Sequence, residues 1–368
     1  MRLFQTGELR LLKEVKERFR LKPDEKGVIV GIGDDAAVIA PHRKKTIVTT
    51  DMMNEGVHFD LAYTSPFHLG FKLVSVNVSD IMAMGGDPKF LFLDLAFTRD
   101  ADEDFFKGVY DGIDQAMDLY GVQLLGGDLC SARSDTVLSA TVIGEGDRVI
   151  TRGGACPGDR IYLTSSTGGS ACGLEILRRL DDAGKEKIKK IAGEIRKSEA
   201  WSEMQTQGKI EELVLKMDAG RVRVKWDIAA PLLMRHLMPV ARDSSGFAPY
   251  ATSMIDVSDG LFIDLCRICD ESKTGALVYS EKIPLSEEVK QAGQLLGMEP
   301  LRMAESGGED YEILFTAADF PVEPYNSSHD IKVTCIGEIT REERTVIDKE
   351  GRQSTLKEEG YQHFGPQG

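Results

Sequence analysis

The sequence predicts an α/β protein of the α+β type that is divided into two domains. Its 368 residues are long for one compact domain, whereas two domains of ordinary size can each bury a core. Segments with helical spacing and segments typical of strands follow one another along the chain. The segment Arg148–Gly158, with its glycines and a Pro-Gly-Asp turn, is the best candidate boundary. We therefore expect an N-terminal domain over residues 1–147 and a C-terminal domain over residues 148–368.

Composition narrows the functional class. An apolar fraction of 42% and a charged fraction of 29% are typical of soluble globular proteins, and no apolar run is long enough to span a bilayer. We expect a cytoplasmic protein without a membrane partner. Lys and Arg total 45 against 60 Asp and Glu, a net charge of −15, so we do not expect a broad electropositive surface for nucleic acid.

The cysteines do not indicate a metal or redox site. Cys266 and Cys269 form one C-x-x-C, but no second pair or nearby histidine completes a zinc site. Their spacing inside LFIDLCRICDE is helical, and we expect both thiols to pack in the core.

The N-terminal half begins with a predicted amphipathic helix over Glu8–Phe19, followed by a strand over Val28–Ile32 that runs into Gly33-Asp34-Asp35. The segment GIGDDA matches a dinucleotide-binding fingerprint. We reject that interpretation, because a strand, a basic turn and a second strand ending in Thr49-Thr50-Asp51 follow instead of a helix.

Two further acids of this half stand out. Ser65-Pro66 is a suitable cap for a helix that runs to Met84, and Asp80 lies on the stripe of that helix that should be buried. A metal role for Asp80 is favoured over a satisfied core aspartate. Gly126-Gly127-Asp128 closes a predicted strand, where it either brings backbone close to a ligand or forms only a turn. The other expected elements are strands at 90–97, 122–125 and 136–144 and a helix at 105–120.

In the C-terminal half, a strand, the loop Ser165–Ser170 and a helix form a unit whose amides could hold phosphate, although ordinary turn chemistry explains the loop equally well. No P-loop motif occurs. Residues 181–225 are polar, and apolar residues at helical spacing predict a helical surface excursion.

A second acidic segment ends the strand over Ser253–Val257. Asp256 lies at that strand's end, and Ser258-Asp259-Gly260 opens a helix. Capping and the helix dipole account for Ser258 and Asp259 but not for Asp256. Ser306-Gly307-Gly308-Glu309-Asp310 precedes a further strand over 311–315, and another strand is expected at 332–336.

These acids share one chemistry. They lie at strand ends or on a helix face that should be buried, and no histidine or cysteine accompanies them at ligand spacing. Oxygen-only ligands select hard cations, which predicts several Mg²⁺ ions and a polyphosphate substrate. Phosphoryl transfer needs positioning and charge neutralisation more than a nucleophilic side chain, and no Ser-His or Cys-His arrangement is evident. Two-carboxylate glycoside hydrolysis leaves most of the acids unexplained.

The ordered motifs GIGDDAAVI, TTDMMNEGVHF, VNVSDIMAMGGDP, LLGGD, TRGGACPGD, IDVSDGL, SGGEDYE, CIGEIT and GYQHF resemble the thiamine-monophosphate kinase family. That family is part of the superfamily of aminoimidazole-ribonucleotide synthetase. The resemblance implies a two-domain aminoimidazole-ribonucleotide synthetase-like fold whose N-terminal domains dimerise through their sheets. It also implies transfer of the ATP γ-phosphate to thiamine monophosphate, giving thiamine diphosphate and ADP.

The resemblance also implies site residues. Magnesium-site positions are matched by Asp35, Thr49, Thr50, Asp51, Asp80, Asp128, Asp256 and Asp259. ATP-site positions are matched by Gly127, Asp128, Arg152 and Ser258. Positions that contact thiamine are matched by His58, Glu309 and Tyr361. A carboxylate can meet the positive thiazolium, and an aromatic ring can stack on it or on the pyrimidine.

The chain departs from the family pattern mainly at residues 181–225, which are longer than expected, and Asp34 has no firm role. The alternatives are another ATP-dependent enzyme of the superfamily, similar to aminoimidazole-ribonucleotide synthetase, and a non-catalytic nucleotide or Mg²⁺ sensor on the same fold. Direct in-line transfer is expected, because no side chain presents itself as a phosphate carrier.

Overall fold

The computed structural model describes residues 8–19, 28–30, 38–39, 44–195, 211–218 and 220–362. The chain forms two compact units. Unit 1 contains Met1–Ile81, Gly86–Val149 and Lys185–Glu199, and unit 2 contains Met82–Gly85, Ile150–Gly184 and Ala200–Gly368. Of the predicted acids, Asp34 and Asp35 lie outside the described residues.

Unit 1 is built on a four-stranded sheet in the order β3-β6-β4-β5, in which only β4 and β5 run parallel. Its strands are β3 (Lys45–Asn54), β4 (Asp87–Thr98), β5 (Gln123–Ala132) and β6 (Val137–Gly146). The helices are α2 (Glu8–Arg18), α3 (Pro66–Ala83) and α4 (Glu103–Tyr120). Two short strands, β1 (Val28–Val30) and β2 (Val38–Ile39), pair with each other.

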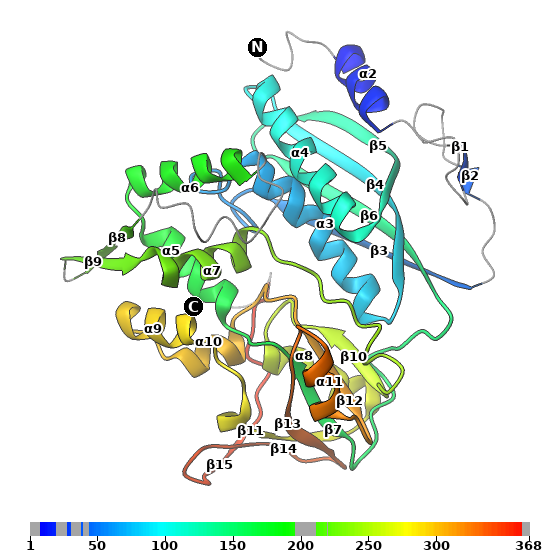
Figure 1. Ribbon diagram of the computed structural model, residues 1–368, viewed down its shortest axis with the longest axis vertical. Helices are drawn as coiled ribbons and strands as arrows, with labels where there is room; N and C mark the ends of the chain where they lie inside the picture. The colour runs from blue at the N-terminus through cyan, green and yellow to red at the C-terminus, as the bar shows by residue number, and fades with distance from the viewer. Residues whose placement is uncertain are drawn as a thin grey trace. The chain divides into compact units, whose positions relative to one another are not determined.

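Local chemistry sets the helix ends in unit 1. Ser65 Oγ accepts the His68 backbone N–H at 3.2 Å at the start of α3, which confirms the predicted cap. Asp102 caps α4 by accepting the Phe105 N–H at 2.8 Å, and Gly121 ends α4 in a left-handed conformation. Figure 1 shows α3 and α4 side by side over one face of the sheet. On the other face, Val48 and Met52 of β3 are 61% and 60% exposed.

Unit 2 is built on a seven-stranded sheet in the order β10-β12-β7-β13-β11-β14-β15, in which only β11 and β14 run parallel. Its strands are β7 (Arg160–Thr164), β10 (Ser253–Asp256), β11 (Gly275–Tyr279), β12 (Ile313–Ala317), β13 (Val333–Thr340), β14 (Arg344–Ile347) and β15 (Gln353–Thr355). The helices that begin in this half are α5 (Gly169–Arg179), α6 (Asp182–Ile195), α7 (Trp226–Leu237), α8 (Leu261–Ser272), η2 (Ser280–Lys282), α9 (Glu287–Leu296), α10 (Pro300–Ser306) and α11 (Val322–Ser328).

The central strands of the larger sheet are buried on both faces. Successive residues of one strand belong to different cores: Ile161 and Leu163 pack with α8, whereas Tyr162 packs in an aromatic core with Phe247 and Phe315. This follows from the alternation of side chains along a strand. Cys266 and Cys269 are 1% and 0% exposed within the first core, which confirms the core interpretation of the C-x-x-C pair.

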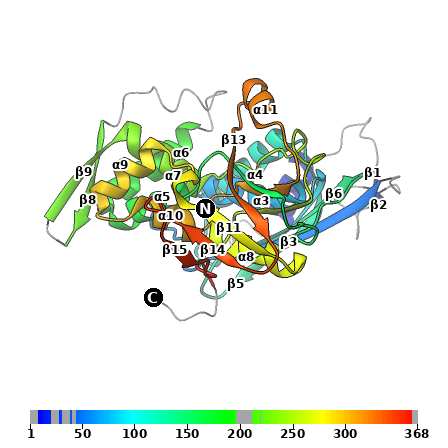
Figure 2. The ribbon, with the colours of Figure 1, turned by 90° about the horizontal axis from the view of Figure 1, so that it is seen from below.

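The excursion at residues 181–225 is helical only in part. Helix α6 is present, but Glu212–Met217 and Gly220–Lys225 form an antiparallel hairpin, β8 and β9, so the helical prediction is wrong there. The period was misjudged, because Leu213 and Leu215 are both buried, as alternate residues of a strand are. Figures 1 and 2 place the hairpin beside α7.

No helix in the described part of the chain is long and apolar enough to cross a membrane.

Candidate functional site

Strand β3 and helix α3 bring together three of the predicted metal-site residues. Thr49 Oγ1 donates to Asp80 Oδ2 at 2.6 Å, and the Asp51 backbone N–H donates to Asn77 Oδ1 at 2.9 Å. Asn77 and Asp80 lie one turn apart on α3, as their spacing predicts. We call Thr49, Asp51, Asn77 and Asp80 the β3–α3 acidic group. Asp51 is exposed and Asp80 is half-buried.

The sheet separates two other predicted residues from this group. Thr50 is paired with Thr141, whose hydroxyl donates to the Thr50 hydroxyl at 3.1 Å, and the alternation along β3 directs Thr50 to the other face from Thr49. Asp128 lies on β5, the opposite edge strand from β3. Three strand spacings, about 14 Å, therefore separate the backbones of Asp128 and Asp51.

Strand β5 does not end at Gly126-Gly127-Asp128 as predicted but continues to Ala132. Gly127 has a φ of 151°, and a Cβ at this position would lie 1.9 Å from the Leu93 carbonyl oxygen of β4. The glycine thus permits a close approach between neighbouring strands. Asp128 pairs in register with Asp94, and both are exposed.

His58 lies in the turn after β3. The ring atom Nδ1 of His58 accepts the Asn54 backbone N–H at 3.0 Å. The backbone N–H of His58 donates to the Asn54 carbonyl at 2.9 Å. Because Nδ1 accepts, Nε2 is the nitrogen that carries the proton in this arrangement. The ring is only half-buried.

The described residues contain no group of three or more His, Cys, Asp or Glu side chains placed to hold a metal ion. The donor chemistry nevertheless fits Mg²⁺, because the β3–α3 acidic group offers two carboxylates, a hydroxyl and an amide, all through oxygen atoms. Mg²⁺ usually binds through one or two carboxylates together with substrate phosphates and water, and does not require a complete protein cage.

In unit 2, two acidic segments far apart in sequence lie side by side. β10 pairs with β12 so that Asp256 faces Ile313, and the pairing continues beyond the strands. The Glu309 N–H donates to the Ser258 carbonyl at 2.7 Å, and the Tyr311 N–H donates to the Val257 carbonyl at 2.9 Å. The IDVSDGL and SGGED segments therefore form one surface, with Asp256 buried and Glu309 half-buried.

Asp264, which the sequence interpretation missed, anchors the first of these segments. Its Oδ2 accepts the backbone N–H groups of Ser258, Asp259 and Gly260 at 3.1, 3.2 and 3.2 Å. Burial raises the pKa of Asp264 to about 6, against the opposing effect of Arg267. Arg267 contacts Asp264 Oδ1 at 2.5 Å and Asp259 Oδ2 at 2.6 Å.

Tyr361 joins this surface and Arg152 does not. The Tyr361 N–H donates to the Asp259 carbonyl at 2.9 Å, and the tyrosine is 46% exposed. The Arg152 carbonyl instead accepts from Ser272 Oγ at 3.1 Å, at the last residue of α8. The Ser258 segment precedes the first residue of α8, so the length of that helix, about 16 Å, separates the two backbones.

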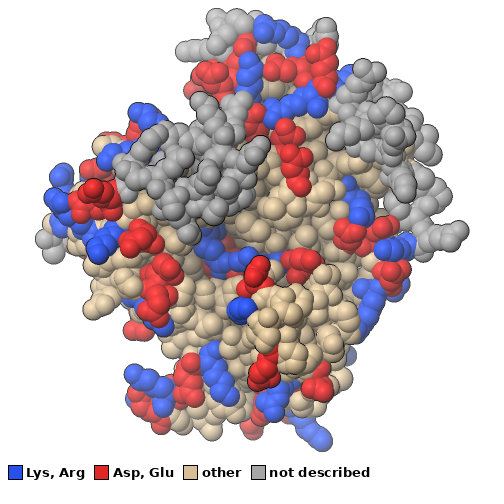
Figure 3. All heavy atoms as spheres, viewed as in Figure 1, with Lys and Arg blue, Asp and Glu red and all other residues tan. Residues whose placement is uncertain are grey.

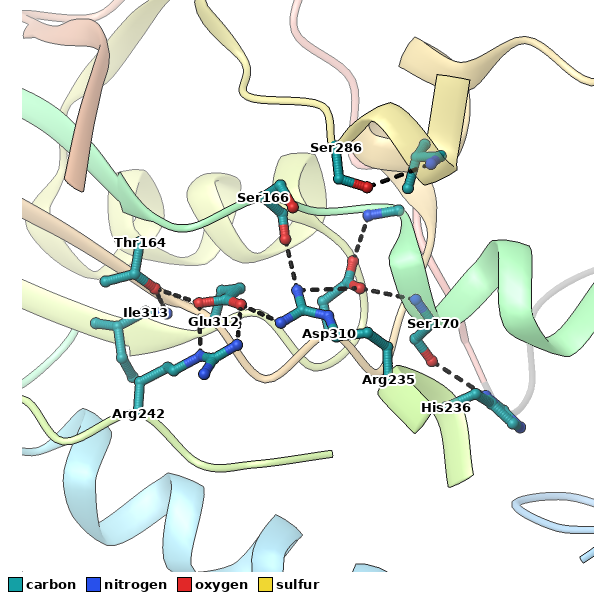
Figure 4. A network of polar contacts seen from close by, with 12 residues as sticks. Thr164, Ser166, Ser170, Arg235, His236, Arg242, Ser286, Asp310, Glu312 and Ile313 are labelled. Atoms are coloured by element: carbon teal, nitrogen blue, oxygen red, sulfur yellow. Dashed lines mark hydrogen bonds and ion pairs between the residues drawn. The ribbon is translucent and has the colours of Figure 1, made fainter. Parts of the chain in front are cut away.

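In the glycine loop Ser165–Ser170, an internal carboxylate occupies two of the backbone amides. Asp310 accepts the Gly168 N–H at 2.6 Å and the Ser170 N–H at 2.9 Å (Figure 4). Of the two interpretations left open by the sequence, the structure supports turn chemistry, with an internal carboxylate at the start of α5. Burial raises the pKa of Asp310 to about 6, and Arg235 opposes that shift.

Glu312 lies at the centre of the same network. Arg242 contacts it through two nitrogens at 2.7 and 2.9 Å, Arg235 pairs with Oε1, and Thr164 Oγ1 donates to Oε2 at 2.6 Å (Figure 4). Burial would raise the pKa of Glu312, but the two arginines outweigh it and lower the pKa. We call Asp310, Glu312, Arg235 and Arg242 the buried carboxylate network. Its sequence signal is two alternating acids after Gly-Gly and the paired arginines of RHLMPVAR.

Charges of both signs are interspersed over the face drawn in Figure 3. The negative excess of the chain is thus not gathered into one patch on that face. The acidic groups described above are set apart by their hydrogen bonds. The predicted strand end at Thr49-Thr50-Asp51 is wrong, because β3 runs on to Asn54, as β5 runs on past Asp128 to Ala132.

Comparison with known proteins identifies the family of the chain. Residues 33–145 match the AIR synthase related protein, N-terminal domain, and residues 156–349 match the AIR synthase related protein, C-terminal domain. The thiamine-monophosphate kinase of Aquifex aeolicus (strain VF5) is 31% identical over 367 residues, covering 99% of this chain and 100% of the relative.

Two solved structures are similar in fold. Thiamine-monophosphate kinase from Stenotrophomonas maltophilia K279a has a TM-score of 0.71 at 28% identity, covering 94% of this chain and 97% of the other. The structure of AaThiL complexed with AMPPCP and TMP has a TM-score of 0.67 at 29% identity, covering 99% of each chain. The α/β two-domain fold, the order of the acidic motifs and the near-complete coverage lead to one conclusion: the chain belongs to the AIR synthase related family and, within it, to the thiamine-monophosphate kinases.

Proposed function

We propose that this protein is an enzyme that transfers the γ-phosphate of ATP to thiamine monophosphate, giving thiamine diphosphate and ADP. The observation that carries the proposal is the similarity to a thiamine-monophosphate kinase over 99% of the chain and the whole of that relative, with no domain missing from the comparison. A relative solved with AMPPCP and TMP supports the same pair of substrates, a nucleoside triphosphate and a phosphorylated acceptor.

The reaction is a direct in-line transfer. A phosphate oxygen of thiamine monophosphate forms a bond to the γ-phosphorus while the bond from that phosphorus to the β–γ bridging oxygen breaks, and ADP leaves. Such a transfer depends on positioning and on stabilisation of charge on the transferred group. The described polar clusters supply hydrogen-bonding oxygens and fixed backbone, in keeping with this route.

Mg²⁺ is the proposed metal. Within unit 1, Thr49, Asp51 and Asp80 would hold it through oxygen atoms, and the predicted ligands Asp35, Thr50 and Asp128 stay part of the proposal. Within unit 2, Asp256 and Asp259 are the proposed ligands. When bound, Mg²⁺ neutralises phosphate charge and polarises phosphoryl oxygens. Asp51 and Asp80 are fixed on β3 and α3 independently of the metal, which supports a partly preorganised site.

The substrate contacts are proposed from the resemblance and from exposure. Gly127, Asp128, Arg152 and Ser258 would contact ATP, and His58, Glu309 and Tyr361 would contact the thiamine acceptor. Glu309 and Tyr361 belong to one surface, because the backbones of both residues bond to the Ser258-Asp259 segment. A half-buried carboxylate and an exposed aromatic residue on one surface suit a cationic heterocycle.

The decisive experiment incubates the purified protein with MgATP and thiamine monophosphate and follows thiamine diphosphate and ADP by chromatography. We expect equal amounts of both products, and no product when Mg²⁺ is removed by a chelator. ATP hydrolysis without thiamine diphosphate would favour another enzyme of the superfamily. ATP binding without turnover, over a range of Mg²⁺ and monovalent cations, would favour a sensor.

A homodimer is also proposed. The sheet face of unit 1 opposite α3 and α4 carries Val48 and Met52, both highly exposed, and a two-fold interface can pair such a face with itself. Sedimentation of the wild-type protein should give the mass of a dimer, and Val48→Asp with Met52→Asp should give a monomer. A wild-type monomer at micromolar concentration would reject this part.

The proposal keeps two further expectations. Residues 1–147 form the ATP- and Mg²⁺-binding, dimerising half and residues 148–368 the second half. The protein acts in the cytoplasm, a location that fractionation of the source cells can test.

A further inference from the structure

We propose that His236 is a positioning residue that holds the Glu309 carboxylate toward the cationic ring of the acceptor. It would thereby set the preference of the site for a charged ring over a neutral one. The inference rests on the proposed function, in which Glu309 contacts thiamine monophosphate. Its central observation is that His236 Nδ1 lies 3.2 Å from Glu309 Oε2 and 3.0 Å from Ser170 Oγ.

The backbone around Glu309 is held in an unusual conformation. Glu309 and Tyr311 have φ values of 64° and 50°, in the left-handed region that non-glycine residues rarely adopt. Such conformations persist where the surroundings over-determine them, and they gather at ligand-binding segments.

Each of the residues Glu309 to Glu312 is bonded to another segment of unit 2. The Glu309 N–H bonds to Ser258, and the Asp310 carboxylate bonds to the start of α5. The Tyr311 N–H bonds to Val257, and Glu312 lies between Arg235 and Arg242. The Cα position of Glu309 is therefore fixed, and the freedom that remains is in its side-chain torsions.

Close packing of α5 against α7 places His236 near the Glu309 carboxylate. A Cβ at Gly173 of α5 would lie 2.1 Å from the Leu232 carbonyl oxygen of α7, so only glycine allows the observed approach. In the last turn of α7, Arg235 Nη2 donates to the Ser166 carbonyl at 2.6 Å while His236 meets Ser170. Figure 4 shows both side chains reaching the same loop.

The chemistry of the contact determines which atom donates the hydrogen bond. An ionised carboxylate oxygen only accepts, so Nδ1 is the donor to Glu309. The His236 side chain is 4% exposed and that of Glu309 is 27% exposed. The imidazole thus holds the carboxylate from the protein interior and leaves part of it open to solvent. Restricting the side chain before the ligand arrives lowers the entropy lost on binding.

The test compares His236→Leu, which removes the donor and keeps an apolar side chain of similar bulk, with His236→Asn, whose amide N–H can occupy the position of Nδ1. The acceptors are thiamine monophosphate and 3-deazathiamine monophosphate, in which a neutral thiophene replaces the thiazolium. For His236→Leu we expect the KM for thiamine monophosphate to rise about tenfold, with the KM for ATP and the kinetics with the neutral acceptor changed less than twofold. His236→Asn should retain most of the wild-type preference.

An equal loss with both acceptors, or an equal rise in the KM for ATP, would mean that His236 only supports the fold, and would overturn the proposal. If His236→Leu does not fold, Ser170→Ala removes the second contact of the ring, and an unchanged ratio between the two acceptors would then reject the proposal. The wild-type protein is the reference. If the wild type turns over thiamine monophosphate and the variants have the same kinetic constants, this inference alone is rejected. If the wild type shows no turnover, the proposed function is rejected.

Discussion

The β3–α3 acidic group and the buried carboxylate network stabilise negative charge in opposite ways. In the network, Glu312 is fully buried and receives two guanidinium groups and a hydroxyl. In the β3–α3 acidic group, Asp51 is exposed, and the hydrogen bonds described above hold its backbone and the Thr49 hydroxyl. The fold surrounds Glu312 with its own cations in the interior, whereas Asp51 lies exposed at the surface. Acidic residues alone therefore do not identify a metal site, because the fold also uses them as buried counter-charges.

The largest effect should come from breaking the network. Glu312→Gln removes the negative charge between Arg235 and Arg242 and leaves two guanidinium groups without their buried counter-charge. We expect the free energy of unfolding to fall by about 3–5 kcal/mol. Denaturant unfolding followed by circular dichroism measures this change. The exposed Glu287→Gln on α9 is the control and should change stability by less than about 0.5 kcal/mol. Equal losses in both variants would remove the distinction between the two regions.

Asp51→Asn tests the other side of the comparison. Because Asp51 is exposed, we expect stability to stay within about 0.5 kcal/mol of the wild type, while kcat/KM falls by about 10²–10³-fold through loss of charge stabilisation. The phosphotransfer assay measures the activity. Asp118→Asn, at an exposed position of α4, is the matched control. An active Asp51→Asn enzyme would show that the metal site is elsewhere.

His68 provides a pH test of unit 1 that is independent of both acidic regions. Burial lowers the pKa of His68 to about 3, from an ordinary value of 6.5. Between pH 6.5 and pH 3 the unfolded chain binds a proton that the folded chain excludes, so stability falls as the pH falls through this window. From pH 7 to pH 5 the loss from His68 is about 2 kcal/mol.

The measurement is the difference in unfolding free energy between pH 7 and pH 5 for the wild type and for His68→Asn. The variant should lose less stability on acidification by about 2 kcal/mol. An identical pH dependence in the two proteins would contradict the burial of a neutral imidazole at this position.

The smallest expected effect is a difference in Mg²⁺ dependence between variants of two adjacent threonines, Thr49 and Thr50. Thr49 donates to Asp80, whereas Thr50 bonds to Thr141 on the other face of the sheet. Thr49→Val should raise the Mg²⁺ concentration for half-maximal activity about fivefold, the scale of one lost hydrogen bond, and Thr50→Val should change it by less than about twofold. A Mg²⁺ titration of activity measures both. A larger effect from Thr50→Val would place the metal on the open face of the sheet.

Much of the fold was predictable because its signals are local. Capping at Ser65, the helical spacing on α3 and α4 and the strand before Ser258 all appear in the structure. The hairpin β8–β9 was missed because Leu213 and Met217 are four apart, as on a helix face, while Leu213, Leu215 and Met217 also alternate as in a strand. The burial of Leu213 and Leu215 selects the strand. The run of β5 through Asp128 was missed because the close approach of Gly127 to β4 is a contact between strands.

For the candidate site, too, some features follow from the sequence and others only from the tertiary structure. By itself the sequence determined which oxygen donors are available and predicted Mg²⁺ from them, because residue type, motif spacing and the lack of a histidine at ligand spacing are properties of the sequence. The family resemblance then placed Glu309 and Tyr361 with the acceptor. Only the tertiary structure decided what each acid contacts. Asp310 and Glu312 stand beside Glu309 in the sequence, yet the fold surrounds them with amides and arginines from α5, α7 and Arg242. The physical reason is that burial and counter-charge are set by segments distant in the sequence, which no local pattern brings together.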